Sequence, residues 1–214
     1  MRKKLIILVV IAAAFALSCN GTKSANAAKS ANAEIKKGVA PIADSEVAII
    51  EMETPAYGTI KVELYSNIAP NAVLRFKELA KEGYYSGIEF HRINDMVIQA
   101  GDANTKPGAT VPTSGKQGDS GKPNVPAEFS DVPYDNGILG AARLSNDVNS
   151  ANAQFFITLK RMSDFDAKYT VFGKVLEGMS NVRTISGVTP KEGERPLEPV
   201  RIKTIKIVPR EEAK

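Results

Sequence analysis

Residues 90–102 read FHRINDMVIQAGD, and residues 153–158 read AQFFIT. Both stretches predict β-strands that carry polar and aromatic side chains in unusual places. Because strand side chains alternate between two faces, Gln154 and Phe156 share one face while Phe155 takes the other. An arginine, two glutamines and a phenylalanine on such strands suit a shallow site that binds a group both apolar and amide-like.

Regular elements are predicted on both sides of these two strands. A helix should begin at Pro70, which suits the first helical position, and end at Gly83, a natural C-cap. The segment 103–134 is rich in Gly and Pro and should be irregular. Strands are expected at 47–53, 59–65, 138–142, 169–175 and 200–208, with a bulge or bend between Ile202 and Ile205 and a second helix at 178–185. Many strands, two helices and frequent turns favour an antiparallel barrel or sandwich.

The N-terminus predicts export. Three basic residues precede the apolar run 5–17, which is shorter than the about 20 residues of a spanning helix but matches a signal-peptide core. We therefore predict a signal peptide at residues 1–18. Cys19 follows in a context that resembles a bacterial lipobox, which would make it the lipidated first residue and anchor the protein to a membrane. The alternative is cleavage after Ala27, which would release the protein into the periplasm or medium.

The remaining chain divides into three parts. Residues 19–45 lack aromatics and a useful period, which predicts a flexible tether. Residues 46–209 form one folded domain, and residues 210–214 form a C-terminal tail. Removing the leader lowers the net charge from +4 to +1. No cluster of basic residues is left for phosphate, so nucleic acid is not expected as a partner.

Most catalytic chemistries are disfavoured by residue types. Cys19 is the only cysteine and lies outside the domain, so an internal disulfide or a Cys/His pair is impossible. His91 is the only histidine, and a metal site or a Ser/His/Asp triad would depend on it alone. No Gly-rich loop joins a strand to a helix to bind nucleotide phosphates. We therefore expect neither a metal nor a cofactor.

Four motifs in order resemble those of cyclophilin-type peptidyl-prolyl cis-trans isomerases. The likeness runs from about Val47 to Val208, nearly the whole predicted domain. The motifs are FHRI at 90–93, VIQAGD at 97–102, QFFI at 154–157 and YTVFGKV at 169–175. The resemblance implies a closed eight-stranded antiparallel β-barrel with a helix at each end, a monomer that acts on proline-containing polypeptides.

The resemblance also assigns residue roles by position. Arg92 matches the catalytic arginine. The chain is one residue shorter than the family pattern between Arg92 and Gln99, and Met96 falls where the pocket phenylalanine usually lies. Asp164 stands where the family has a cyclosporin-contacting aromatic residue, so weak binding of that drug is expected. The residues matched to substrate binding are Met96, Gln99, Ala142, Arg143, Gln154, Phe156, Phe165 and Tyr169.

The sequence thus predicts an exported, membrane-anchored isomerase that rotates X–Pro bonds and assists the folding of envelope or secreted proteins. The isomerisation needs no proton transfer and no nucleophile, which agrees with the residue types present. The alternative is a proline-peptide-binding scaffold or chaperone with weak or no turnover. A small-ligand barrel is less favoured, because the bulky inward residues predict a filled interior.

Overall fold

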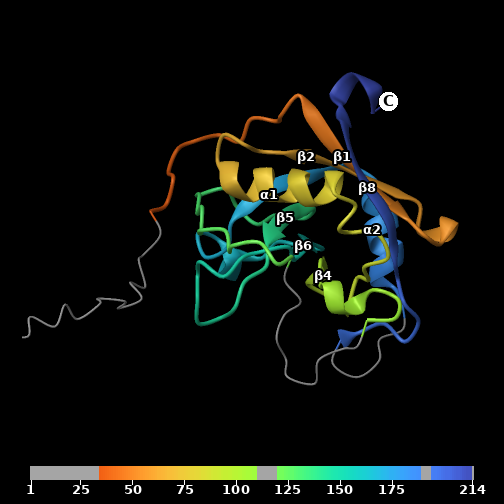
Figure 1. The fold of residues 1–214 in the computed structure, drawn as a ribbon. Coiled ribbons are helices and arrows are strands. Elements are labelled where there is room, and N and C mark those ends of the chain that lie inside the picture. Colours follow the sequence, from red (N-terminus) through yellow and green to blue (C-terminus); the bar gives the residue numbers. More distant parts are fainter. Residues whose placement is uncertain (1–33, 110–119, 189–193, 214) are drawn as a thin grey trace, which may run out of the picture.

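The computed structural model describes residues 34–109, 120–188 and 194–213 (Figure 1). Within them, eight strands form one antiparallel sheet and two α-helices pack against it. The strands are β1 (Glu46–Met52), β2 (Thr59–Leu64), β3 (Arg92–Ile93), β4 (Val97–Ala100), β5 (Ile138–Ala141), β6 (Phe155–Thr158), β7 (Val171–Glu177) and β8 (Ile202–Pro209). The helices are α1 (Pro70–Lys81) and α2 (Met179–Ser186).

The strand order is β3-β4-β6-β5-β7-β2-β1-β8, and the sheet curves into a half-barrel. The predicted closed barrel is wrong in one respect, because β3 and β8 form no ladder with each other. The two edges meet at one isolated bridge between Glu89 and Arg201, where the Phe90 amide donates to the Val200 carbonyl at 2.9 Å. The opening arises because β3 contributes only two residues to the sheet.

The interior of the half-barrel is filled with large apolar side chains. Phe155 lies at its centre, with ring centroids 5.4 Å from Phe76 of α1, 5.6 Å from Tyr85 and 6.3 Å from Phe90. Helix α1 begins at Pro70, as predicted, and contacts β7 and β8, whereas α2 contacts β2 and β4 (Figure 1). The sequence placed Phe155 on the face opposite Phe156, and the structure shows that this face is the core face.

The predicted bend in the last strand is present. Along β8, Thr204 pairs with Glu51 and Ile202 pairs with Met52 of β1, which leaves Lys203 as an extra residue. One inserted residue reverses the alternation of side chains beyond it. Ile202 and Ile205 are therefore both buried although three positions separate them.

The irregular segment after β4 has a structural role at α1. The Glu128 carboxylate accepts hydrogen bonds from the Asn71 amide at 3.1 Å and from the Ala72 amide at 3.0 Å. The first amides of a helix have no partner within the helix and favour negative charge. Glu128, buried although it is distant in sequence, therefore stabilises the start of α1.

The end of the segment predicted as a tether lies along the domain. Lys36 donates from its amide to the Phe129 carbonyl at 2.9 Å and from Nζ to the Ile68 carbonyl at 2.8 Å. The Asp44 amide donates to the Leu64 carbonyl at 2.9 Å. The proposed signal peptide and Cys19 lie outside the described residues. No helix in the described part of the chain is long and apolar enough to cross a membrane.

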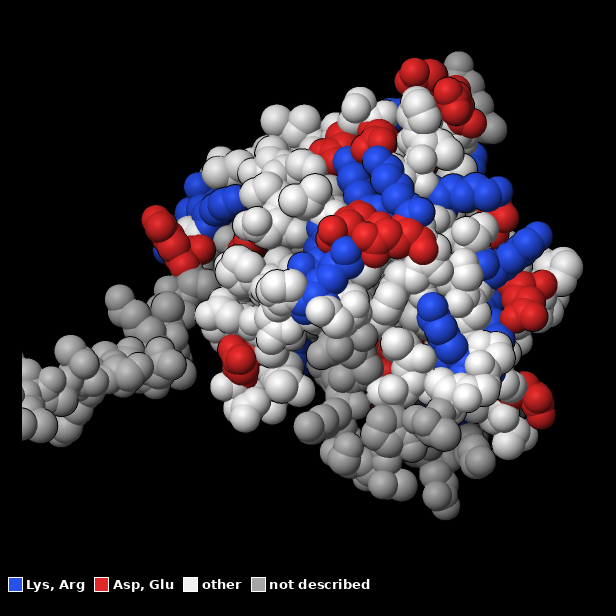
Figure 2. Space-filling view, viewed as in Figure 1, with Lys and Arg blue, Asp and Glu red and all other residues white. Residues whose placement is uncertain are grey.

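Charges of both signs are interspersed on the face that carries α1 (Figure 2). Lys77 pairs with Asp44 at 2.6 Å and with Glu46 at 3.0 Å. Lys122 pairs with Glu78 at 3.0 Å and with Glu82 at 2.8 Å, which joins the irregular segment to α1.

Candidate functional site

A hollow of about 220 Å³ opens beside the paired strands β3, β4 and β6. Arg92 of β3 pairs directly with Gln99 of β4, and Gln99 pairs with Phe156 of β6. Because directly paired residues point to the same face of a sheet, their side chains converge there. The hollow is lined by Arg92, Val97, Gln99, Ala142, Arg143, Phe156, Phe165 and Tyr169.

The turn between β3 and β4 sets which residue lines the hollow. The Asn94 side-chain oxygen accepts hydrogen bonds from the amides of Met96 at 2.9 Å and Val97 at 2.8 Å. Because of this tight turn, β4 begins at Val97. Val97 is two positions before Gln99, so their side chains lie on the same face of the strand. The placement of Met96 in the hollow is therefore a correction: Val97 lines it, and Met96 packs against the core from the turn.

Phe156 forms the floor of the hollow within an aromatic cluster. Its ring stacks on buried Tyr134, with centroids 5.8 Å apart and planes at 24°. The rings of Phe165 and Tyr169 meet Phe156 edge to face at 5.6 Å and 5.7 Å. Such contacts on three sides hold the ring in one orientation, so the floor is rigid before any ligand arrives.

A chain of side-chain amides orients the arginine. Gln99 Nε2 donates to Gln154 Oε1 at 2.8 Å, and Arg92 Nη1 donates to Gln99 Oε1 at 3.5 Å. Gln154 therefore contacts the site through Gln99, although its side chain does not line the hollow. The Gln154 Nε2 atom is buried and has no hydrogen-bond partner in the described part of the chain.

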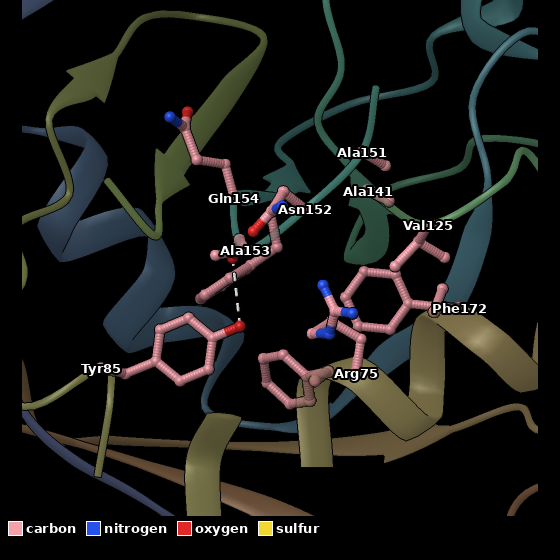
Figure 3. Close-up of a pocket in the computed structure, with 12 residues that line it drawn as sticks. Arg75, Tyr85, Val125, Ala141, Ala151, Asn152, Ala153, Gln154 and Phe172 are labelled. Atoms are coloured by element: carbon pink, nitrogen blue, oxygen red, sulfur yellow. Dashed lines mark hydrogen bonds between the residues drawn. The ribbon is translucent and has the colours of Figure 1, made fainter. Parts of the chain in front are cut away.

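A second, much smaller hollow lies under α1 on the other side of β6 (Figure 3). It holds about 20 Å³, room for roughly one water molecule. The Tyr85 hydroxyl donates to the Ala153 carbonyl at 3.1 Å along its wall. Figure 3 shows the Gln154 side chain pointing away from Tyr85. The larger hollow with Arg92 is therefore the candidate site.

The rim opposite Arg92 is formed by Ala142 and Arg143. The Ala142 amide already donates to the Gln154 carbonyl at 2.9 Å, so a peptide would have to use the Ala142 carbonyl or the Arg143 backbone. The Arg143 guanidinium lies 4.5 Å from the centroid of the Tyr169 ring and donates only to carbonyls, among them that of Lys168. Cation–π contact and these hydrogen bonds fix the rim.

Glu194 is the site residue that sequence reasoning missed. Its Oε2 accepts from Arg92 Nε at 2.5 Å, and its Oε1 accepts from Asn94 Nδ2 at 2.8 Å. These bonds, that from Asn94 foremost, lower the pKa of Glu194, so the carboxylate is ionised near neutral pH. Glu194 lies about a hundred residues from Arg92, in a stretch of sequence (189–199) rich in Glu and Pro, and no local pattern signals the contact.

His91 does not contribute to the hollow. Its burial lowers the pKa of the imidazole, which favours the neutral form. In the described residues, no three His, Cys, Asp or Glu side chains are grouped so as to hold a metal ion. The polar groups that border the hollow are therefore hydrogen-bond donors and amides, which suit a peptide backbone.

Gly140 gives a direct test of the floor. A Cβ atom there would lie 2.2 Å from Phe156 Cζ and 2.7 Å from the Tyr134 hydroxyl. Gly140→Ala should destabilise the domain by about 1–3 kcal/mol, as overpacking does. It should also raise KM for a proline peptide, because the Phe156 ring must move.

Gly187→Ala is the matched control for that substitution, since its added Cβ would meet nothing closer than 3.5 Å. Urea unfolding measures the stability of both variants, and steady-state kinetics measure their KM for a proline peptide. If Gly140→Ala keeps the wild-type KM, the position of Phe156 does not govern substrate binding.

Taken together, an arginine, an amide chain and a rigid aromatic floor in one shallow hollow define a peptide-binding β-domain. Comparisons with known proteins narrow this class. Residues 49–207 match the family described as cyclophilin type peptidyl-prolyl cis-trans isomerase. A peptidyl-prolyl cis-trans isomerase of Schizosaccharomyces pombe is 38% identical over 159 residues, which cover 73% of this chain and 96% of the relative.

A probable peptidyl-prolyl cis-trans isomerase of Brucella suis is 37% identical over 196 residues, covering 89% of this chain and 90% of the relative. A similar solved structure is a cyclophilin-type isomerase of Cryptosporidium parvum, crystallised in the presence of the dipeptide Ala-Pro. It has a TM-score of 0.67 at 28% identity and covers 76% of this chain and 98% of that one. The chain belongs to the cyclophilin-type peptidyl-prolyl cis-trans isomerase family. The enzymatic activity predicted from the sequence is thereby confirmed.

Proposed function

We propose that Arg92 carries the isomerisation of X–Pro bonds at this hollow. Rotating a peptide bond costs about 18–20 kcal/mol because its resonance is lost. In the twisted state the lone pair of the prolyl nitrogen is localised and accepts a hydrogen bond. A donor that meets this nitrogen only in the twisted state lowers the barrier by differential binding.

The observation that carries this proposal is that Arg92 and Phe156 border the same hollow. Phe156 would bind the apolar proline ring, while the Arg92 guanidinium donates to the amide that rotates. Gln99, hydrogen-bonded to Gln154 at 2.8 Å, would orient Arg92 or bind a peptide carbonyl. The backbone of Arg143 would hold the peptide on the opposite rim.

The substrate class would be proline-containing polypeptides. The related Cryptosporidium parvum protein was crystallised in the presence of Ala-Pro, which supports a proline ring as the recognised group. NMR exchange spectroscopy on an Ala-Pro peptide, with and without catalytic amounts of the protein, tests the proposal. We expect cis and trans signals to exchange faster with the protein. Binding shifts without faster exchange would favour the proline-peptide-binding scaffold or chaperone instead.

We further propose that the protein is exported and anchored through Cys19, and that its substrates are envelope or secreted proteins. The order of basic residues, a short apolar run and Cys19 supports this. The full-length gene is expressed in bacteria, the protein is purified from both the membrane and the soluble fractions, and its intact mass tests the proposal.

Lipidation would give a chain that begins at Cys19 and carries the added mass of acyl chains. Cys19→Ser is the matched control and should lack that mass and leave the membrane fraction. A mature wild-type chain that begins at Ala28 without acyl chains would contradict the anchor but not the export.

A further inference from the structure

The ion pair between Glu194 and Arg92 joins two distant parts of the chain at the rim of the site. It uses the Nε atom of the guanidinium, at 2.5 Å, while Nη1 faces Gln99 Oε1 at 3.5 Å. Two of the three guanidinium nitrogens are thus bonded to neighbours on different elements. Nη2 has no partner among the residues that the structure describes, and it remains available to a ligand.

Glu194 is itself held from two directions. Asn94 donates from Nδ2 to the second carboxylate oxygen at 2.8 Å, and the same side chain closes the β3–β4 turn through the Val97 amide. The next residue, Arg195, donates to Glu89 at 2.9 Å. Glu89 is 4% exposed, so the chain at Glu194 is fixed to a buried point rather than to a mobile surface group.

The pair does not have the properties of a strong stabilising contact. The side chains of Arg92 and Glu194 are 38% and 41% exposed, and ion pairs so exposed add little to stability because water and salt screen them. The ion pair instead restricts the orientation of the Arg92 guanidinium. A long arginine side chain samples many rotamers, and bonds at Nε and Nη1 leave one plane for the guanidinium.

We propose that Glu194 is a positioning residue for the isomerase reaction: it holds the Arg92 guanidinium so that Nη2 faces the rotating amide. The inference rests on the proposed role of Arg92. In the ground state the substrate amide is planar and does not need the donor, so a misplaced guanidinium lowers kcat more than it raises KM. The Glu194 carboxylate contributes an acceptor in a fixed place, and not a proton.

The test compares Glu194→Ala, Glu194→Gln and the control Asp95→Ala in the full chain. Ordering one long side chain is worth roughly 2- to 10-fold in rate, and Glu194→Ala should lower kcat by that factor with KM within about twofold. Glu194→Gln keeps one acceptor for Nε but turns its amide nitrogen toward the Asn94 Nδ2 donor, so it should recover only part of the loss. Asp95 lies beside Asn94 in the β3–β4 turn and pairs with Lys160 at 2.6 Å. Asp95→Ala therefore removes a nearby exposed carboxylate that has no ion pair with Arg92 in the described part of the chain.

A spectroscopic signature separates positioning from a general loss of structure. The Arg92 Nε–H resonance should be resolved in the wild type and in Asp95→Ala, and lost or shifted in Glu194→Ala while the unfolding midpoint stays unchanged. In an Arg92→Ala background, Glu194→Ala should have no further effect on kcat. If Arg92→Ala is impaired but Glu194→Ala turns over as fast as the wild type or faster, the inference is overturned and the proposed role of Arg92 stands. If Arg92→Ala is itself unimpaired, the proposed catalytic role fails first.

Discussion

Arg92→Ala should lower kcat/KM for an Ala-Pro peptide by roughly 10- to 150-fold, the rate equivalent of one charged hydrogen bond of about 1.5–3 kcal/mol. The fold should persist, because the Arg92 side chain is 38% exposed and its carboxylate partner is 41% exposed and can be solvated. Exchange NMR or a protease-coupled assay measures the activity, and urea unfolding measures the stability.

The chemistry explains why the loss should be large but incomplete. Phe156 and the aromatic residues around it remain in Arg92→Ala, so the proline ring should still bind and KM should change less than kcat. Arg92→Lys keeps the charge but loses the planar fork that Gln99 and Glu194 hold, and it should fall between alanine and wild type.

Arg183→Ala is the matched control, since Arg183 lies on α2 and lines a different surface hollow. It should retain wild-type activity. Equal activity of Arg92→Ala and Arg183→Ala would remove Arg92 from the mechanism, and catalysis would then have to come from desolvation and pocket shape alone.

The sequence predicted most of what depends on local patterns. Strand alternation placed Phe155 and Phe156 on opposite faces. In the structure Phe155 packs in the core and Phe156 lines the hollow, which confirms the alternation. Pro70 marked the start of α1 because its fixed backbone angle suits that position. The switch in apolar parity revealed the β8 bulge, because one extra residue reverses every later side chain.

What could not be predicted depends on contacts between distant segments. Met96 was placed in the hollow by its position in the family pattern, but the Asn94 turn shifts that place to Val97. Glu194 reaches Arg92 across the fold, and a lone acidic residue in a loop carries no periodicity. The opening between β3 and β8 likewise depends on which backbones pair, and side-chain patterns in the sequence do not predict that pairing.

The largest stability effect is expected at that opening, where Glu89 joins the two edges. Its carboxylate accepts from Arg201 Nη2 at 2.7 Å and from Arg195 Nη2 at 2.9 Å, and the side chain is 4% exposed. Glu89→Ala should reduce the free energy of unfolding by about 3–5 kcal/mol, because it leaves an uncompensated cation near the interior. The Arg201 side chain is 19% exposed and that of Arg195 is 41% exposed, so the Arg201 guanidinium is harder to solvate after the carboxylate is removed.

Urea unfolding checks this, with Glu51→Ala as the matched control. Glu51 also joins two strands by an ion pair, to Lys206 at 2.6 Å, but both partners are more exposed, so its loss should cost only about 0–1 kcal/mol. Glu89→Gln keeps an acceptor without the charge and should fall between the two. If Glu89→Ala is as stable as Glu51→Ala, the Arg201 guanidinium must be solvated at the opening once its carboxylate partner is removed. The backbone hydrogen bonds from Gly87 and Phe90 would then suffice to hold the edges of the half-barrel together.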